Sequence, residues 1–460
     1  MRFFSLAAAL LGSASLASAL PKAVSHSQTP DGFLEVKPGT FKDLKVTYEN
    51  TLNGTYKEEE SRIVPAPSST DAAAAALDGE VGAQATLGLN FVNNFGGAIN
   101  AYITGKDESG RVVFVRGDGS LLYPSSGGSE TPVPVGQDGR IALAAGQNFN
   151  MVLPIALESA RIYYSAGDLI FGVVRTPIGD GLVQPAPNNP SDPSAGINWG
   201  FVELTLLPNG TLYANISYVD FVGLPLGMEL TVNGGDPTQS AFGVGRGAVT
   251  NICNALSAQA GRDGRPWNRL CMGNAAGPVR ALSPTAYTDI DSASFADYWH
   301  AYRDQVWDRY RGEPLVIDTQ REFGRINCWV RGDALECDGD NRAYFKPEAI
   351  DIWGCDRGPF GKQSGDNQVH LAVIPRLCAA FVRSTLLVGG GNVQPSLGQA
   401  NYYRVEPTNH YSRVVHENEV DGKGYAFAYD DVNPTGTENA SGTVAHGSPN
   451  TLRVFIGSPP

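Results

Sequence analysis

Metal-binding and redox side chains are scarce in this 460-residue sequence, which contains only six cysteines, six histidines and four methionines. The cysteines form no CxxC pair, and the histidines do not follow the spacing of metal ligands. A zinc site is therefore not expected, and neither is another metal or a cofactor. Asp430 and Asp431 are adjacent, but such a pair is more typical of a helix cap or a solvated turn than of a metal site.

Positive charge is also in short supply. The 34 lysines and arginines are outnumbered by 47 aspartates and glutamates, which gives a formal net charge of −13. Binding to nucleic acid is not expected, because it favours a basic surface. Long apolar runs are missing beyond the first residues, so neither a membrane span nor a lipid anchor is expected.

The N-terminal residues carry a targeting pattern. Residues 1–19 have a basic start, an apolar centre and a small-residue end, which is typical of a secretory signal peptide cleaved after Ala19. We therefore expect a secreted, extracellular protein. Sequons at Asn53, Asn209 and Asn439 are predicted glycosylation sites on this route.

The six cysteines suit three disulfides in an oxidising compartment. Several pairings are compatible with six cysteines, and the sequence favours the sequential one: Cys253–Cys271, Cys328–Cys337 and Cys355–Cys378. The clearest signal is Arg331-Gly332-Asp333, a hairpin turn that would bring Cys328 and Cys337 together.

Changes in pattern along the chain divide it into segments. Residues 20–84 are expected to form a polar N-terminal extension. Two roles are open for it: residues 44–50 add a strand to the fold, or the extension serves as a pro-segment. Short strands separated by turn residues predict a β-sandwich or barrel domain over 85–282. A mixed α/β domain is expected over 283–435, and residues 436–460 return to the β domain as a C-terminal strand.

The expected fold class is thus mainly β with an α+β part, and a cleft is expected between the β domain and the smaller mixed domain. Two helices are predicted in the mixed domain. One is capped by Ser294 and carries aromatic residues at helical spacing, and the other spans roughly Pro375 to Leu387.

Two carboxylates, Glu203 and Asp220, stand in apolar β-type surroundings within residues 199–230. Charged side chains are rarely placed there without a partner or a task. Alternation puts Phe201, Glu203 and Thr205 on one strand face, and Val202, Leu204 and Leu206 on the other. Pro208-Asn209-Gly210 then predicts a turn into a second strand.

Two registers are open for this hairpin. A three-residue loop with Gly210 in the left-handed region sets Glu203 opposite Asn215 and Thr205 opposite Tyr213, with Ser217 facing Phe201. In this register the Asp220 side chain would lie on the opposite strand face from Glu203.

A two-residue Asn-Gly turn instead places Asp220 on the face of Glu203. The Cβ separation would be roughly 14 Å, and inward-leaning side chains would bring the carboxyl groups to about 8–9 Å. That separation is typical of glycosidases that invert the anomeric centre.

The segments WGFVELTL and YVDFVGLPLGMEL resemble the catalytic hairpin of glycoside hydrolase family 64, a family of β-1,3-glucanases with a thaumatin-like fold. Three later segments agree: RALSPTAY followed by PLVID, VIPRLCAAFVRSTLL, and NHYSRVVHENEVDGKGYAFAYDDV. The resemblance runs from about Ala85 to the C-terminus. It implies that Glu203 is the general acid and Asp220 the general base of an inverting enzyme, and that Thr205 is a groove residue.

The expected protein is a monomeric, endo-acting hydrolase of β-1,3-glucan that releases short laminari-oligosaccharides. Tyr213 and Ser217 join Thr205 as expected substrate-binding residues. The main alternative is a thaumatin-like glucan-binding or defence protein without turnover, which would need no second acid. A hydrolase of another β-glucan is a third reading.

Overall fold

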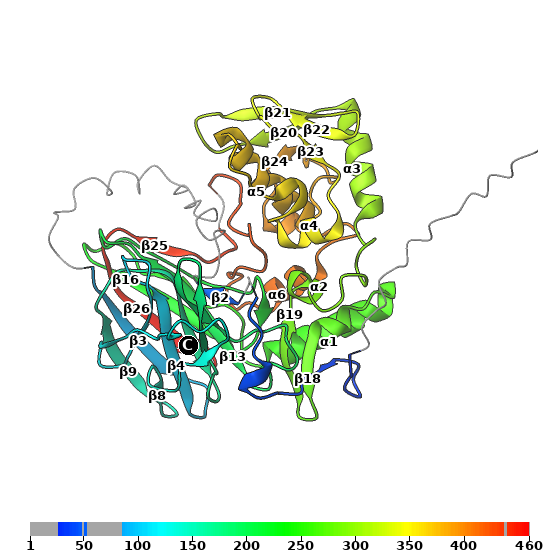
Figure 1. Cartoon of the computed structure of the whole chain (residues 1–460). Helices are drawn as coiled ribbons and strands as arrows, with labels where there is room; N and C mark the ends of the chain where they lie inside the picture. The colour runs from blue at the N-terminus through cyan, green and yellow to red at the C-terminus, as the bar shows by residue number, and fades with distance from the viewer. Residues whose placement is uncertain (1–25, 48–49, 53–84, 437–438, 460) are drawn as a thin grey trace, which may run out of the picture.

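The computed structural model describes residues 26–47, 50–52, 85–436 and 439–459, so the expected signal peptide and Asn53 lie outside the described residues. A β-rich body and a smaller part built of helices and a five-stranded sheet lie side by side (Figure 1). The expectation of a mainly β chain with a helical part is confirmed. None of the described helices combines the length and the apolar character that crossing a membrane requires.

The β-rich body is formed mainly by two sheets. The larger has the path β25-β14-β13-β10-β4-β5-β6, with β8 also paired to β4. Its strands are β25 (Val444–His446), β14 (Leu212–Ile216), β13 (Trp199–Leu206), β10 (Leu157–Ser165), β4 (Ile99–Lys106), β5 (Val112–Val115), β6 (Leu121–Leu122) and β8 (Ile141–Leu143).

The second sheet has the order β17-β16-β26-β3-β9. Its strands are β17 (Gln239–Ala241), β16 (Leu226–Val232), β26 (Pro449–Ile456), β3 (Leu87–Asn93) and β9 (Asn148–Leu153). Alternating apolar residues of both sheets, such as Val202 of β13 and Val454 of β26, belong to one buried cluster. This is the packing of a β-sandwich. β26 pairs parallel to β3 and antiparallel to β16.

Part of the expected N-terminal extension packs on this body. β1 (Leu34–Glu35) pairs with β18 (Cys271–Asn274), which continues to β19 (Gly277–Leu282) and β15 (Phe221–Val222). β2 (Thr51–Leu52) pairs with β12 (Gly179–Val183), in a sheet with β11 (Gly172–Thr176) and β7 (Val133–Pro134). The described part of residues 44–50 is not a strand. Leu34, Val36, Leu44 and Leu52 are buried, so this segment contributes core rather than a purely polar tail.

The smaller part contains the sheet β23-β22-β21-β20-β24. Its strands are β20 (Leu315–Asp318), β21 (Arg325–Arg331), β22 (Ala334–Cys337), β23 (Tyr344–Phe345) and β24 (Val393–Gln394). The α-helices of the described residues are α1 (Ala248–Asp263), α2 (Pro284–Thr288), α3 (His300–Gly312), α4 (Ala349–Gly354), α5 (Gln368–Val382) and α6 (His410–Glu417). Buried residues of α1, α3, α5 and α6 belong to the same cluster as the sandwich core, so the two parts share one continuous interior.

Two helix predictions need correction. α3 begins at His300 rather than at Ser294, because Asp291 binds the backbone N–H groups of Ala293 and Ser294 and holds that segment in turns. α5 begins earlier than expected, at Gln368, where the Asn367 side chain accepts a hydrogen bond from the backbone of His370. It ends at Val382, and Pro375 lies inside the helix.

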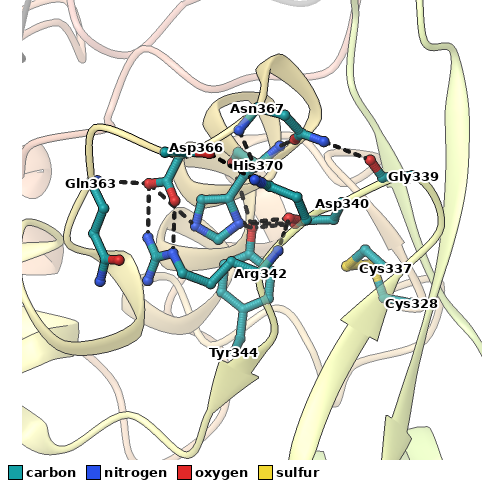
Figure 2. A network of polar contacts seen from close by, with 12 residues as sticks. Cys328, Cys337, Gly339, Asp340, Arg342, Tyr344, Gln363, Asp366, Asn367 and His370 are labelled. Atoms are coloured by element: carbon teal, nitrogen blue, oxygen red, sulfur yellow. Dashed lines mark hydrogen bonds and ion pairs between the residues drawn. A yellow bond between two sulfur atoms is a disulfide. The ribbon is translucent and has the colours of Figure 1, made fainter.

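A buried polar network joins α5 to the loop after β22 (Figure 2). The imidazole Nδ1 of His370 lies 2.8 Å from Asp340, whose other oxygen accepts a 2.8 Å hydrogen bond from the Tyr344 hydroxyl. Asp366 accepts hydrogen bonds from Arg342 through both Nε and Nη2, at 2.8 and 2.9 Å. Each of these buried charged groups has a partner, because burying an unpaired charge is energetically costly.

All three disulfides form in the expected sequential pairing. Cys253–Cys271 ties α1 to β18, and Cys355–Cys378 ties the end of α4 to α5. Cys328 and Cys337 face each other across β21 and β22, as the predicted hairpin turn requires.

Candidate active site

The hairpin of β13 and β14 has the three-residue register. Glu203 pairs with Asn215 and Thr205 with Tyr213. Gly210 has a φ of +84°, and Asn209 accepts a hydrogen bond from the backbone of Thr211, which stabilises this turn. The two-residue alternative, with Asp220 on the strand face of Glu203, is therefore wrong.

Asp220 lies on a connection rather than on a strand. β14 ends at Ile216, and Ser217 forms a bridge to Tyr425 instead of continuing the pairing with β13. Asp220 then follows just before β15, where its backbone carbonyl oxygen accepts a 2.8 Å hydrogen bond from the Ser283 N–H. The alternation of side chains between the two faces of the hairpin therefore does not determine the direction of the Asp220 carboxylate.

Glu203 lies in the middle of a polar row that runs across three strands. Arg161 of β10 and Asn215 of β14 are its direct cross-strand neighbours. The Arg161 guanidinium lies 3.1 and 3.3 Å from Glu203 Oε1, through Nη2 and Nε, and the Asn215 amide donates to Oε2 at 3.3 Å. The Glu203 side chain is 34% exposed, so it is supported from both sides and still open to solvent.

Aromatic rings form the next row of the same face. Tyr163 pairs with Phe201, and the Arg161 guanidinium lies 4.5 Å from the centre of the Phe201 ring. The Tyr163 hydroxyl hydrogen-bonds to Gln184, and burial raises the pKa of this phenol to about 12. Tyr163 is thus neutral across the physiological pH range, and its hydroxyl group donates a hydrogen bond to Gln184.

The expected substrate-binding residues are placed differently from one another. Thr205 and Tyr213 form the row beyond Glu203 and are half-buried. Ser217 is buried, being 8% exposed, and it lines a small hollow with Phe201 and Tyr218. Thr205 and Tyr213 therefore extend the polar face, whereas Ser217 lies at its inner edge.

The segment after α6 supports the connection that carries Asp220. The backbone N–H of Tyr218 donates to the Tyr425 carbonyl oxygen, and the Tyr425 N–H donates to that of Ile216. The Tyr218 hydroxyl accepts a 2.9 Å hydrogen bond from the Val244 N–H. The chain around Asp220 is thereby held by residues far away in the sequence.

A buried charged cluster lies behind this segment. His416 Nδ1 lies 2.8 Å from Glu419, and its Nε2 lies 2.9 Å from Asp430. Burial alone would lower the pKa of His416, but the charges of Glu419 and Asp430 outweigh it and raise the pKa to about 10. Asp430 also binds Arg383 at 2.8 Å and accepts a hydrogen bond from the Ala426 N–H. Asp430 is thus part of an ion-pair cluster with His416 and Arg383. The described residues contain no group of three or more suitable side chains that could hold a metal.

Sequence reasoning missed Arg161 and Gln184. Arg161 begins the motif RIYY, where a lone cation precedes aromatic residues in a buried strand. A charged residue in such an apolar strand could have been recognised as a candidate site residue. Its pairing with Glu203 was not readable, because it depends on β10 lying beside β13. Gln184 follows β12 and carries no sequence signal.

Known proteins are similar to this chain in sequence and in structure. Residues 85–456 match the model of glycoside hydrolase family 64, described as β-1,3-glucanase. A glucan endo-1,3-β-glucosidase of Cellulosimicrobium cellulans and another of Arthrobacter sp. (strain YCWD3) are each 30% identical over 362 residues, covering 76% of this chain. The chain spans 62% of the length of these curated relatives.

Solved structures are similar as well. The crystal structure of a laminaripentaose-producing β-1,3-glucanase in complex with laminaritetraose superimposes with a TM-score of 0.70 at 29% identity, covering 81% of this chain and 99% of that one. A β-1,3-glucanase domain from Clostridium beijerinckii has a TM-score of 0.63 at 20% identity, covering 81% and 98% of the respective chains, and this likeness concerns the fold.

Proposed function

Because the chain belongs to glycoside hydrolase family 64, the β-1,3-glucanases, we propose that it is a secreted, endo-acting hydrolase of β-1,3-glucan. It releases short laminari-oligosaccharides with inversion of the anomeric carbon. The observation that carries the proposal is Glu203, a partly exposed carboxylate held by Arg161 and Asn215 on the hairpin of β13 and β14. Asp220 lies on the connection that follows this hairpin, and its charge acts on the Arg161 guanidinium.

The roles follow from the chemistry of an inverting glycosidase. Glu203 donates its proton to the glycosidic oxygen as the bond to the anomeric carbon breaks. Asp220 accepts a proton from a water molecule, whose oxygen attacks the anomeric carbon from the opposite face. Each carboxyl group changes its protonation state once, and proton exchange with solvent restores both.

The polar face beside Glu203 is suited to a neutral sugar. Thr205, Tyr213 and Asn215 offer hydroxyl and amide groups, and they are half-buried on neighbouring strands. We place the glucan along this face, in a cleft between the thaumatin-like sandwich and the smaller part of the chain. Ser217 at the inner edge supports this face. The three disulfides suit an oxidising, extracellular environment, and the protein acts as a monomer.

Hydrolysis of laminarin by the purified full chain tests the proposal. Glu203→Gln keeps the side-chain shape but removes the proton, so turnover should fall by about 10²–10⁴. Asp220→Asn should lower turnover to a similar extent.

Glu229→Gln is a matched control, because Glu229 also lies on a strand and pairs with an arginine, Arg453, at 3.4 Å. It should retain wild-type activity. A folded chain that binds laminarin without releasing reducing ends would instead favour the glucan-binding alternative. Activity only on another β-glucan would identify a different substrate.

A further inference from the structure

Trp329 of β21 is a tryptophan that faces solvent. It is partly exposed, although Cys328 and Val330 on either side of it are buried. The five other tryptophans of the sequence are each at most 2% exposed: Trp199, Trp267, Trp299, Trp307 and Trp353. Burial of a large aromatic ring is a major source of stability, and exposed apolar groups with a polar rim mark binding sites. Trp329 is therefore a candidate contact for a ligand.

Trp329 lies on the outer face of the sheet β23-β22-β21-β20-β24, which we call the small sheet. Asn327 and Arg331 stand two residues before and after it and are exposed on the same face. The inner face packs on helices, and there the Tyr344 hydroxyl contacts His370 of α5 at 2.8 Å. Figure 1 shows α4 and α5 between this sheet and the β-rich body, so the outer face points away from that body. The solvated face of a sheet normally carries polar residues, and Trp329 departs from that rule.

Phe345 brings a second aromatic ring to the outer face. Tyr344 points towards α5, so its neighbour Phe345 points outwards, and Phe345 is 65% exposed. In the sheet register Phe345 pairs with Ala334, and Ala334 pairs with Arg331, which follows Trp329 by two residues. Strand spacing and rise then set the Cα atoms of Trp329 and Phe345 about 12 Å apart. The two rings can therefore contact different units of one extended polymer.

The arginines beside these rings are paired with carboxylates. Arg331 Nη1 lies 3.5 Å from Glu336 Oε2, and Glu336 is the cross-strand partner of Trp329. Arg325 Nε lies 3.2 Å from Asp318 Oδ2. This pairing disfavours an acidic ligand, because neither arginine brings an uncompensated positive charge to the face. A neutral sugar polymer suits the surface, since its rings have apolar faces for the aromatic side chains and hydroxyl groups for the polar ones.

We propose that the outer face of the small sheet is a second β-1,3-glucan-binding surface, on which Trp329 and Phe345 are platforms for sugar rings. Arg331, Glu336 and Asn327 provide hydrogen-bonding groups around these platforms. The identity of the polymer rests on the proposed function of the chain. Figure 1 shows the small sheet at the end of the smaller part, away from β13 and the candidate active site. The surface therefore holds the polymer while a different stretch of it is cut.

Quenching of tryptophan fluorescence by acrylamide tests this surface directly, because Trp329 is the partly exposed tryptophan and the five others are buried. The Glu203→Gln chain serves as the sample, so that added laminarin stays intact. Laminarin should protect this chain from quenching. The protection should be lost when Trp329→Phe is added to the same chain. Protection that persists without Trp329 would come from another site and would overturn the proposal.

Binding to insoluble β-1,3-glucan measures the contribution of both rings. Trp329→Thr combined with Phe345→Thr retains residues that favour strands and removes the platforms. Sedimentation with the polymer should show binding weakened by about tenfold or more, because the apolar area that the rings bury is lost. The kcat and KM on short soluble laminari-oligosaccharides should stay at wild-type values. Tyr123→Thr is the control, because it removes an exposed ring outside the small sheet and should leave binding unchanged.

The outcomes separate this surface from its alternatives. Unchanged binding of the double variant to insoluble β-1,3-glucan would overturn the proposal. A wild-type dimer that the double variant dissociates would show that a second copy of the chain covers the face, which would also overturn it. Inactivity of the wild type on laminarin, with the protection of Trp329 intact, would reject the proposed function alone. Hydrolysis of laminarin without that protection would reject the second surface alone.

Discussion

The phenol hydroxyl of Tyr411 on α6 donates a 2.7 Å hydrogen bond to the backbone carbonyl oxygen of Tyr218. Both residues are buried, and the bond spans 193 positions of the sequence. Tyr218 lies two residues before Asp220, so α6 directly restrains the connection that carries the proposed base. The helix thus stabilises this connection through a contact with its backbone.

Tyr411→Phe should weaken this restraint. The variant leaves the Tyr218 carbonyl group without its buried donor, which costs about 1–3 kcal/mol of unfolding free energy. Displacement of Asp220 should lower kcat by up to about 10²-fold, with a smaller change in KM. Denaturant unfolding and steady-state kinetics on laminarin check both effects. Tyr310→Phe is the control, because that hydroxyl also donates to a buried carbonyl, of Leu386 at 2.7 Å, so it should lose stability but keep kcat.

The charged cluster around His416 makes stability depend on pH. The pKa of His416 is raised to about 10 in the folded protein from an ordinary value of 6.5, because Glu419 and Asp430 outweigh the effect of burial. A raised pKa means that the contribution to stability is complete below pH 6.5 and is lost as the pH rises through about 10.

His416→Gln should cost about 3–5 kcal/mol at neutral pH, since it removes the paired cation of buried Glu419 and leaves Asp430 with Arg383 alone. This difference from the wild type should shrink as the pH approaches 10. Denaturant unfolding at a series of pH values measures it. His300→Gln, which alters an exposed pair with Glu348, should show little change at any pH. A difference that stayed constant with pH would show that the His416 charge does not matter.

The stereochemistry of the product tests the mechanism itself. Inverting sites hold their carboxyl groups about 6.5–9.5 Å apart to admit a water molecule, whereas retaining sites hold them at roughly 5–5.5 Å. Hydrolysis of the β-linkage should release the α-anomer first, as proton nuclear magnetic resonance of the earliest product can detect. Asp220→Asn should trap no glycosyl-enzyme. Early release of the β-anomer would make Asp220 a nucleophile or exclude it.

Glycosylation provides a test of the proposed sugar-binding face. Asn215 lies in a sequon, but its side chain donates to Glu203 on that face, so a glycan there would block substrate. Mass spectrometry of active protein from a eukaryotic host should find Asn215 unmodified and Asn209, on the exposed hairpin loop, occupied. An active protein fully glycosylated at Asn215 would place the substrate elsewhere.

Local features of the fold were readable from the sequence. The Cys328–Cys337 pair follows from a turn whose residues are adjacent in the chain. The turn after β13 was readable in the same way, but its residues allowed two registers, and the pairing of Glu203 with Asn215 was one of them.

Long-range pairing was not readable. Asp220 is placed by Ser283, by Tyr411 acting through Tyr218, and by the bridge between Ser217 and Tyr425, and no local pattern reports these contacts. Arg161 was missed for the same reason, because its role depends on which strand lies next to β13. The N-terminal segment was expected to be polar because its apolar residues are few and separated, although the buried Leu34 and Val36 alternate in the β manner.

The position of β26 between β3 and β16 has a consequence for the nascent chain. β3 and β16 emerge from the ribosome early, but the strand that joins them emerges only after everything between Val232 and Pro449 has been made. The helices and the small sheet can therefore acquire structure while the sandwich still has a gap at its centre. Closing that gap requires contacts between distant parts of the chain, which is a slow kind of step. A ribosome stalled before residue 449 would leave two inner strand edges exposed to aggregation.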